Sequence, residues 1–254
     1  MTTETRGGRP TLEGARVLVV GASSGIGAAV AQHAMSQGAR VCVAARRAEK
    51  LAELCQGNGA ARAVAADLSD LSDCRRIVTE AVAHLGGLDL LVNAAGAGTL
   101  ATLCDLDPAS WHHDYDVNVV GPTVVCSAAL PHLSPGGLAS FISSTSATEE
   151  RWGLSSYAAS KAALDSTIRT WRLEHPDRRF QRVVMGPTYP TDFGSGFDPE
   201  LAVVAVERWT AAGCASTSMD TDGVGRHLTG LWALSLADPA IDVPDVRLEL
   251  RAVP

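Results

Sequence analysis

Lysine is the scarcest charged residue in this sequence of 254 residues. Of the 21 basic residues, 19 are Arg, and the two lysines are Lys50 and Lys161. Tyr is also rare, with three copies, and no apolar run approaches the ~18 residues that a membrane span requires. The six Cys show no CxxC or His-paired spacing, and the adjacent His112 and His113 do not converge on one ligand site. The sequence therefore predicts no membrane span, no disulfide framework and no metal site.

Basic residues are outnumbered by acidic ones. The 28 acidic side chains give a formal net charge of −7. Binding to a phosphate backbone needs a basic surface, so nucleic acid is not an expected partner. An apolar content of 46% and a charged content of 19% describe a chain that buries a substantial core. Residues 1–12 are polar, do not form a signal peptide, and are predicted to be a mobile tail on a cytoplasmic protein.

Strand-like and helix-like segments alternate along the rest of the chain. Seven apolar or β-branched runs predict strands at 15–20, 40–45, 62–66, 88–92, 138–143, 180–184 and 246–250. Segments with helical spacing lie between them, at 26–37, 48–55, 71–85, 108–133, 155–174 and 221–236. Apolar strands separated by helices predict an α/β fold, a doubly wound parallel sheet covered on both faces, in one domain over 13–254.

One segment, 188–225, interrupts this alternation. It contains several Gly and Pro residues and a Ser/Thr cluster, with a single helical pattern at 199–211. An insertion beside the end of a strand is typical of a substrate lid. The alternative is a surface loop without function.

A glycine-rich turn, Gly21-Ala22-Ser23-Ser24-Gly25-Ile26-Gly27, lies between the first strand and the first helix. Gly21 permits the tight turn, Gly25 lets the backbone approach a pyrophosphate, and Gly27 allows the helix to pack closely. The N-terminus of the helix attracts the anion. The turn predicts a dinucleotide site that includes Ser23, Ser24 and Ile26, and a purely structural turn is the alternative.

The end of the second strand indicates which dinucleotide binds. An acid there would hold a ribose 2′-hydroxyl, but Ala45 is followed directly by Arg46 and Arg47. Guanidinium groups suit a 2′-phosphate, so NADP(H) is favoured over NAD(H). Binding of NAD(H) is one alternative, and two solvated arginines without a role in binding are another. After the third strand, Asp67 and Leu68 are candidates for the adenine amino group and ring, or else for a cap and a core residue.

The segment Tyr157-Ala158-Ala159-Ser160-Lys161 places a phenol and one of the two lysines four residues apart. On a helix this spacing brings both side chains to one face. A nearby cation lowers the pKa of a Tyr from its usual value of ~10, and the phenol is then able to act as acid or base. An exposed pair on an amphipathic helix is the alternative.

Several of these residues together resemble the short-chain dehydrogenase/reductase family. Ser144 lies thirteen residues before Tyr157, the spacing of that family, which selects it over Ser143. The resemblance implies a Rossmann-type fold, a homodimer or homotetramer, and hydride transfer between NADP(H) and a carbonyl or alcohol. It covers roughly residues 12–192 and rests on Gly21 to Gly27, Asn93-Ala94-Ala95-Gly96, Asn118, Ser144, and Tyr157 with Lys161.

The resemblance implies a role for each matching residue. Tyr157 would exchange a proton with the substrate oxygen, and Ser144 would stabilise charge on that oxygen. Lys161 would lower the pKa of Tyr157 and hold the nicotinamide ribose. Asn118 would shape its helix and connect Lys161 through water to a proton path. Further expected dinucleotide contacts are Tyr157 itself and Asn93, Ala94, Ala95, Gly96, Pro187, Thr188 and Thr191.

Some residues depart from the family's pattern. Val20 stands where Thr is usual, and Ala94 replaces a second Asn. After the sixth strand the order is Gly186-Pro187 instead of Pro-Gly, which leaves the backbone path of that loop open. Residues 246–254 lack the common Gly-Gly ending, which puts the usual tetramer contacts in doubt.

The substrate is the least determined part of the site. Expected pocket residues follow the catalytic serine or lie in the lid, and they are Ser146, Trp152, Tyr189, Phe193 and Phe197. Their aromatic character favours an apolar or cyclic carbonyl or secondary alcohol. The leading hypothesis is an NADP-dependent carbonyl reductase or alcohol dehydrogenase. The alternatives are a nucleotide-sensing or scaffold protein without turnover, and an epimerase acting on a nucleotide sugar.

Overall fold

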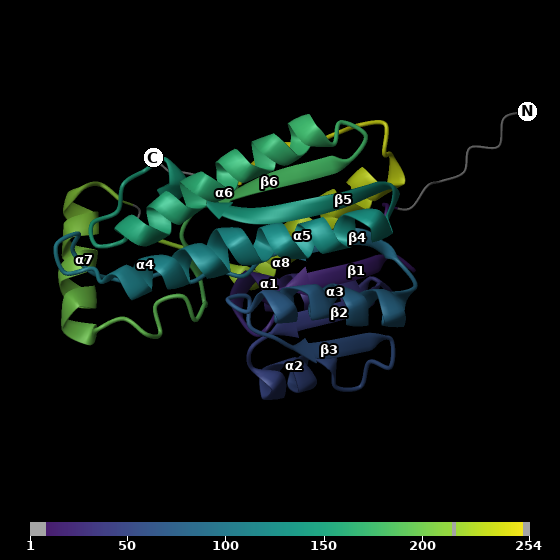
Figure 1. Ribbon diagram of the computed structural model, residues 1–254, viewed down its shortest axis with the longest axis horizontal. Helices are drawn as coiled ribbons and strands as arrows, with labels where there is room; N and C mark the ends of the chain where they lie inside the picture. Colours follow the sequence, from purple (N-terminus) through teal and green to yellow (C-terminus); the bar gives the residue numbers. More distant parts are fainter. Residues whose placement is uncertain (1–8, 215–216, 251–254) are drawn as a thin grey trace, which may run out of the picture.

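A parallel sheet forms the centre of the molecule (Figure 1). The computed structural model describes residues 9–214 and 217–250. Seven strands pair in parallel in the order β3-β2-β1-β4-β5-β6-β9. The chain builds outward from β1 to β3 and then places β4 on the other side of β1, so the switch point of the sheet lies between β1 and β4. The strand bounds are β1 Arg16–Val20, β2 Arg40–Ala45, β3 Ala61–Ala65, β4 Leu88–Asn93, β5 Leu133–Ser144, β6 Arg179–Met185 and β9 Asp245–Leu248.

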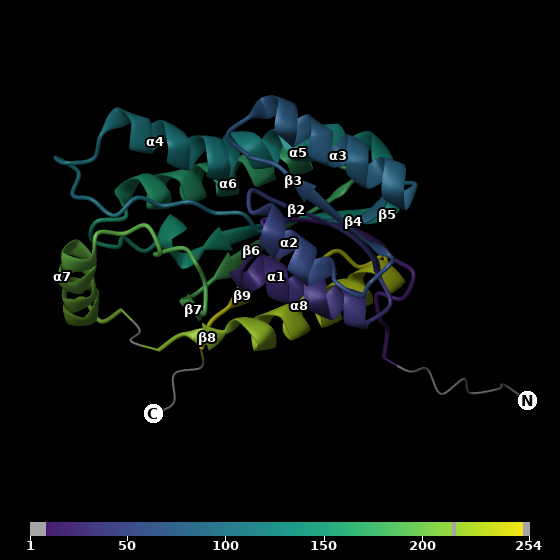
Figure 2. The same ribbon diagram turned by 90° about the horizontal axis from the view of Figure 1, so that it is seen from below.

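Helices cover both faces of this sheet (Figure 2). Alternation along β1 explains the two cores, because Val17 and Val19 pack with one layer of helices while Leu18 and Val20 pack with the other. The first layer contains α1 Gly25–Ser36, α2 Ala48–Cys55 and α8 Thr221–Ala237, and the second contains α3 Leu71–Leu85, α5 Gly121–Ala129 and α6 Ser155–Glu174. The predicted doubly wound α/β fold is confirmed. Among the described residues, no helix combines the length and the apolar character needed to cross a membrane.

The helix predicted at 108–133 is divided in the structure. It consists of α4 Pro108–Tyr115, a π-helical turn at Asp116–Val120, and α5, and a short 3-10 turn then leads into β5. Pro122 has no N–H to donate to the carbonyl four residues earlier. Gly121 packs closely, because a Cβ there would lie 2.6 Å from the Leu68 carbonyl oxygen. These two residues account for a change of helical pitch where the apolar spacing alone predicts a continuous helix.

Two predicted boundaries are wrong. Leu12 does not belong to the mobile tail expected over residues 1–12, because its side chain is 1% exposed and packs in the core beside α1 and α8. Residues 1–8 lie outside the described part of the chain. The segment expected to form a lid, 188–225, ends before Thr221, where α8 begins. Gly225 belongs to that helix layer, since a Cβ on it would lie 2.8 Å from the Ala29 carbonyl carbon.

The segment 188–214 lies beside the layers of the sheet. It begins with β7 Thr188–Tyr189, which pairs with β8 Met219–Asp220, and continues into α7 Pro199–Ala211. Figure 1 shows α7 beyond the carboxyl ends of β5 and β6, apart from the helices that cover the sheet. In a doubly wound sheet, ligands bind at these carboxyl ends.

Candidate active site

The carboxyl end of β5 meets the first turns of α6. Ser144 is the last residue of β5, and Tyr157 lies two residues after the start of α6 at Ser155. The Ser144 side chain lies close enough to the phenol of Tyr157 to lower its pKa, and Ser146 donates its backbone N–H to Ser144 Oγ at 3.1 Å. Lys161 follows one turn later on the same face of α6. The structure brings together the three side chains that the sequence predicts to act as a unit.

The pKa of Tyr157 differs from the sequence-based expectation. Burial raises this pKa, the hydrogen bond with Ser144 lowers it, and the negative charge of Asp114 raises it again. The net shift is upward because burial outweighs the groups that favour the phenolate, so the pKa is not lowered as the sequence predicts. The physical reason is that protein surrounds the phenol while the Lys161 ammonium is directed to another partner.

Lys161 is 3% exposed and is held by β5. Its Nζ donates to the Ile142 carbonyl oxygen at 3.0 Å and lies 5.8 Å from the centroid of the Tyr157 ring. Burial lowers the pKa of Lys161 to about 8, and the charge of Asp165 opposes that change. The ammonium therefore has a pKa close to neutral pH, where its charge responds to nearby groups.

Asn118 lies in the π-helical turn and is fully buried. Its Nδ2 donates to the Ala97 carbonyl oxygen at 2.7 Å and to Ser160 Oγ at 2.8 Å. Its Oδ1 accepts from the Ala97 N–H at 2.9 Å. One side chain thus joins the loop after β4 to the turn of α6 that carries Lys161, at the position where the sequence predicts a local change of helix shape.

The glycine-rich turn has the features that a bound phosphate requires. α1 begins at Gly25, where φ is +56°, and Ser24 makes no side-chain cap within the described chain. The first N–H groups of α1 are therefore available to an anion. Close packing excludes larger residues nearby, because a Cβ on Gly21 would lie 2.4 Å from Ala95 N and one on Gly27 would lie 2.3 Å from the Gly21 carbonyl oxygen. Ile26 packs against the core beneath the turn.

Of the two arginines after β2, only Arg47 is directed to this turn. Its Nη2 donates to Ser23 Oγ at 2.8 Å and to Ser24 Oγ at 3.0 Å. Its Nη1 pairs with Asp192 Oδ2 at 2.5 Å. Arg46 is exposed and makes no hydrogen bond or ion pair with any residue that the structure describes. The structure separates the predicted pair into one guanidinium on the turn and one in solvent.

The two residues expected near adenine have structural partners. Asp67 Oδ1 accepts from the backbone N–H and the hydroxyl of Ser69, both at 2.9 Å. Leu68 is buried in the core that contains Cys74 and Val125. The expectation that Leu68 packs on an adenine ring is corrected, because its side chain is part of the helix and sheet interface. Asp67 is thus a turn residue, and Leu68 is a core residue.

Asn93 ends β4 at the switch point of the sheet. Its side chain is buried, and neither Oδ1 nor Nδ2 has a hydrogen-bond partner among the described residues. Buried amides are nearly always paired, so an orphaned one beside the glycine-rich turn fits a site that a polar ligand completes. Ala94 and Ala95 follow and pack against the two cores, and a Cβ on Gly96 would lie 3.7 Å from Lys161 Nζ.

The segment after β6 crosses the glycine-rich turn. Pro187 takes part through its carbonyl oxygen in the short β7–β8 pairing, and Thr188 Oγ1 donates to the Gly186 carbonyl oxygen at 3.0 Å. Thr191 lies against Gly25, because a Cβ on Gly25 would lie 3.1 Å from Thr191 Cγ2. The path that the Gly186-Pro187 order leaves open in the sequence therefore returns over the N-terminus of α1.

Aromatic side chains cover Tyr157. The ring centroid of Phe193 lies 4.6 Å from that of Tyr157, and Phe197 stands edge-on to Phe193 at 5.5 Å. Trp152 packs in the same cluster. Tyr189, the fourth aromatic residue expected to line the pocket, is 68% exposed in β7 and is not part of this cluster.

Sequence reasoning missed the apolar residues that complete this cluster. Leu201, Ala205 and Trp209 lie four residues apart on one face of α7, and Trp209 Nε1 donates to the Trp152 carbonyl oxygen at 2.9 Å. Leu154, just before α6, packs with them. The four-residue spacing within 199–211 is the signal that identifies this face.

Two buried carboxylates near the site also escaped prediction. Asp114 in α4 accepts a hydrogen bond at 2.5 Å from Oγ of Ser156, the residue directly before Tyr157 in the chain. Asp165 lies one turn after Lys161 and pairs with Arg182. Neither acid belongs to a motif, and on spacing alone each resembles an acid on a solvated helix face.

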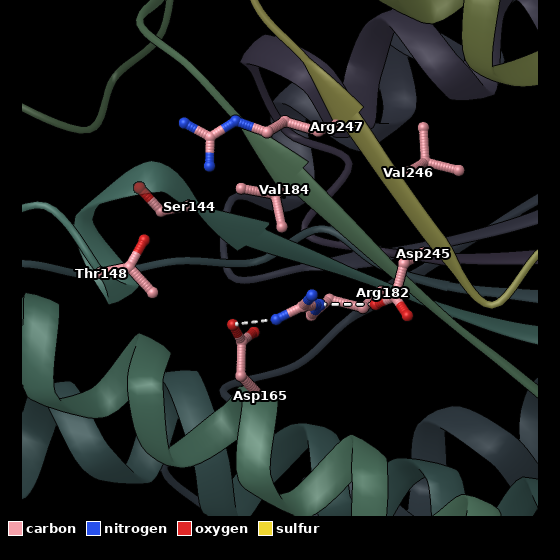
Figure 3. A pocket seen from close by; sticks show the side chains of 8 residues that line it. All are labelled: Ser144, Thr148, Asp165, Arg182, Val184, Asp245, Val246 and Arg247. Atoms are coloured by element: carbon pink, nitrogen blue, oxygen red, sulfur yellow. Dashed lines mark hydrogen bonds and ion pairs between the residues drawn. The ribbon is translucent and has the colours of Figure 1, made fainter.

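A cavity of about 210 Å³ lies on the β9 side of Ser144 (Figure 3). Arg182 crosses its wall and pairs with Asp165 at 2.9 Å and with Asp245 at 2.7 Å. Within the described residues, no three His, Cys, Asp or Glu side chains are grouped as a metal site would need. The cavity is lined by Ser144, Thr148, Asp165, Arg182, Val184, Asp245, Val246 and Arg247.

Comparison with known proteins places this site in a family. The family model described as short chain dehydrogenase matches residues 15–200. The chain belongs to the short-chain dehydrogenase family. The resemblance seen in the sequence is thereby confirmed.

Relatives of this short-chain dehydrogenase are known from sequence and structure. They include the short-chain dehydrogenase/reductase FrzI of Cladobotryum, 38% identical over 170 residues, and 11-beta-hydroxysteroid dehydrogenase-like 2 of Arabidopsis thaliana, 32% identical over 197 residues. These alignments cover 65% and 71% of this chain but 66% and 64% of the two relatives, slightly less than two thirds of their length. The crystal structure of a short chain dehydrogenase from Burkholderia cenocepacia in complex with NADP matches with a TM-score of 0.80 at 29% identity, covering 95% of this chain and 98% of that one.

Proposed function

We propose that this short-chain dehydrogenase is an NADP(H)-dependent oxidoreductase that interconverts a ketone or aldehyde and an alcohol. The observation that carries the proposal is the phenol of Tyr157 beside Ser144, with the buried ammonium of Lys161 5.8 Å from the centroid of its ring. This arrangement stands beside a helix N-terminus that is free to hold a phosphate. An acid, a hydrogen-bond donor for the same oxygen and a cation are the groups that carbonyl reduction needs.

The side chains divide the work of reduction. Bound NADPH supplies the hydride. Tyr157 donates its proton to the substrate oxygen as that oxygen gains charge, and Ser144 donates a hydrogen bond to the same oxygen. Lys161 stabilises the phenolate that remains on Tyr157. The raised pKa of Tyr157 keeps its proton in place at neutral pH, which suits the acid role, and in alcohol oxidation Tyr157 takes the proton instead.

A preference for NADP(H) is supported by Arg47. This guanidinium lies on Ser23 and Ser24 of the glycine-rich turn, and β2 ends at Ala45 without the acid that would hold a ribose 2′-hydroxyl. A guanidinium binds a phosphate through paired, charge-assisted hydrogen bonds. The Burkholderia structure in complex with NADP, which shares this fold, agrees with the preference.

An apolar, cyclic carbonyl compound or secondary alcohol is the proposed substrate class. Phe193, Phe197 and Trp152 lie around Tyr157 on the side where substrate would approach. Apolar and aromatic walls with a few polar groups are typical of pockets for apolar ligands. The name of the Arabidopsis relative refers to a hydroxysteroid, a cyclic alcohol of this class.

Turnover of ketones by purified enzyme tests this function. With NADPH and a panel of cyclic and acyclic ketones, we expect oxidation of the cofactor that Tyr157→Phe reduces by at least about 100-fold, since a general acid contributes ~10²–10⁴ in rate. NADP+ affinity of the variant, measured by calorimetry, should stay within about threefold of wild type, because the phenol hydroxyl is not on the phosphate side of the site.

Tyr115→Phe is the matched control. It removes a phenol hydroxyl from α4, where Tyr115 is not part of the Ser144, Tyr157 and Lys161 group. We expect its turnover to equal that of wild type. Unchanged turnover in Tyr157→Phe would overturn the mechanism. If wild-type protein binds NADPH but none of the ketones leads to its oxidation, the nucleotide-sensing alternative is favoured.

A further inference from the structure

One face of α6 carries a third charged group beyond the proposed catalytic pair. Asp165 follows Lys161 by four residues, just as Lys161 follows Tyr157, so the three side chains lie along one face. That face meets three consecutive residues at the end of β5. Tyr157 lies beside Ser144, Lys161 donates to the carbonyl oxygen of Ile142 at 3.0 Å, and Asp165 accepts from the hydroxyl of Ser143 at 2.5 Å.

The carboxylate of Asp165 is fixed on both oxygens. It is 4% exposed, Oδ1 accepts from Ser143 Oγ, and Oδ2 accepts from Arg182 Nη1 at 2.9 Å. Arg182 in turn donates through Nε to Asp245 Oδ1 at 2.7 Å. Figure 3 shows Asp165, Arg182 and Asp245 in line from α6 to β9. Two donors therefore hold this buried carboxylate in one orientation.

We propose that Asp165 is a positioning residue for proton transfer, holding Lys161 as an ammonium beside Tyr157 and fixing the strand residue next to Ser144. The proposal rests on the function proposed above. Asp165 acts through Lys161 and Ser143. An ammonium that is removed from water needs a nearby negative charge to remain charged.

The charged groups around Lys161 single out Asp165. On α6 itself, Tyr157 is neutral when protonated, and Asp114 on α4 acts on Tyr157. On β6 and β9, Arg182 is shared between Asp165 and Asp245, and Asp245 is also paired with Arg172 of α6. Burial pulls the pKa of Lys161 down to about 8, and Asp165 is the group that opposes this shift.

A purely structural role for Asp165 is the competing explanation. In that case Asp165 only anchors Arg182 and, through it, the edge strand β9. Asp245→Asn separates the two explanations, because it loosens the same Arg182 network at the half-exposed end without removing the charge that faces Lys161. A structural role predicts equal effects of the two substitutions, and the proposed role predicts an effect of Asp165→Asn alone.

The scarcity of lysine makes a direct measurement practical. Full-length protein labelled with ¹³C at lysine Cε gives two side-chain signals, from Lys50 and Lys161, and Lys50→Arg assigns them. We expect Asp165→Asn to reduce the proton affinity of Lys161 at least tenfold, a shift of one pKa unit, as read from an NMR pH titration. Asp165→Glu should restore it to within threefold of wild type, and Asp245→Asn should leave it within threefold.

A second neutral variant keeps the proposal testable if Asp165→Asn does not fold. Asp165→Leu combined with Arg182→Met removes the buried pair as a unit, a change that proteins often tolerate, and it should also reduce the proton affinity of Lys161. An unchanged Lys161 titration in a folded neutral variant overturns the proposal, as does an equal shift in Asp245→Asn. Because the titration needs neither cofactor nor turnover, it stands apart from the ketone assay. Failure of the ketone assay alone overturns the proposed function and leaves the electrostatic result in place.

Discussion

At the scale of single residues, neighbouring arginines have different environments because of where the strand ends. Arg46 and Arg47 follow β2 in consecutive positions, so their side chains leave the backbone in different directions. Both side chains are exposed, but Arg47 reaches Ser23, Ser24 and Asp192, whereas Arg46 has no hydrogen-bond partner among the described residues. Only one of the two is therefore placed to distinguish a phosphorylated ribose from a plain one.

Removal of Arg47 should therefore weaken NADP+ binding selectively. We expect Arg47→Ala to raise the Kd for NADP+ by about tenfold or more and to change the Kd for NAD+ little, because a hydrogen bond to a charged group contributes ~1.5–3 kcal/mol and ~1.4 kcal/mol is tenfold. Calorimetry with both dinucleotides measures this ratio. Arg46→Ala is the matched control, and a larger effect of Arg46→Ala would show that the guanidinium roles are reversed.

Side chains that act through a motif were predictable from the sequence, and those that act through tertiary contacts were not. The spacing of Ser144, Tyr157 and Lys161 along the chain is enough to define a chemical unit. The same pattern has no information about Asp165, because its partners Ser143 and Arg182 come from two different strands. The direction of a side chain at a strand end, as for Arg46 and Arg47, depends on the turn that follows.

At the scale of elements, the segment between β7 and α7 joins two parts of the site. Asp192 pairs with Arg47 on the glycine-rich turn, and the next residue, Phe193, lies on the ring of Tyr157. Thr191, just before them, packs on Gly25. Consecutive residues of one segment thus contact the proposed phosphate side and the proposed catalytic side of the site, and movement of one end must move the other.

The ion pair between Arg47 and Asp192 should compete with a dinucleotide phosphate. We expect Asp192→Asn to increase affinity for NADP+ by up to about fivefold, because an exposed ion pair contributes only ~0.2–1 kcal/mol and its loss frees the guanidinium. Affinity for NAD+ should not change. Calorimetry provides both values, with Asp198→Asn as the control, since Asp198 caps α7 in the same segment without contacting Arg47. Weaker NADP+ binding in Asp192→Asn would mean that the carboxylate supports the site.

The elements themselves were predictable where burial follows periodicity. Helices such as α2 and α3 begin and end where the sequence predicts, because their apolar faces lie on the sheet. The apolar spacing does not predict the division of 108–133, since the π-helical turn depends on the close approach of Gly121 to Leu68 and on Asn118 bridging to Ala97 and Ser160. Those contacts join residues far apart in the chain, so local spacing contains no sign of them.

At the scale of the whole molecule, the two ends of the parallel strands have different roles. The carboxyl ends of β4 and β5 carry Asn93 and Ser144, while Asp89 lies at the opposite end of β4. Asp89 accepts from Arg16 Nη2 at 2.7 Å at the start of β1 and from Ser134 Oγ at 2.8 Å near the start of β5. One carboxylate therefore ties three neighbouring strands together, far from the candidate active site.

Asp89 should make the free energy of unfolding depend on acid pH. Burial raises the pKa of Asp89, but hydrogen bonds and charge from Arg16, together with the Ser134 hydroxyl, outweigh it and bring the pKa to about 2, from an ordinary 3.8. Because the folded-state pKa is the lower one, the stabilisation is fully present above about pH 4 and is lost as the pH falls towards 2. At ~1.4 kcal/mol per pKa unit the contribution is about 2 kcal/mol, an upper value for a partly exposed pair.

Substitution of Asp89 should therefore cost stability without affecting chemistry. We expect Asp89→Asn to lower the free energy of unfolding by about 1–2 kcal/mol at pH 7 and by clearly less at pH 3, measured by urea denaturation at both values, because the wild-type carboxylate is losing its advantage at the lower pH. Turnover of the folded variant should equal that of wild type, since the strand ends that Asp89 joins are opposite those that carry Asn93 and Ser144. Asp177→Asn is the control, because its carboxylate is 73% exposed and its pairing with Arg178 should contribute little at either pH. An equal loss of stability at pH 7 and pH 3 in Asp89→Asn would assign the effect to packing and hydrogen-bond geometry, and the ionised carboxylate would not be what joins the strands.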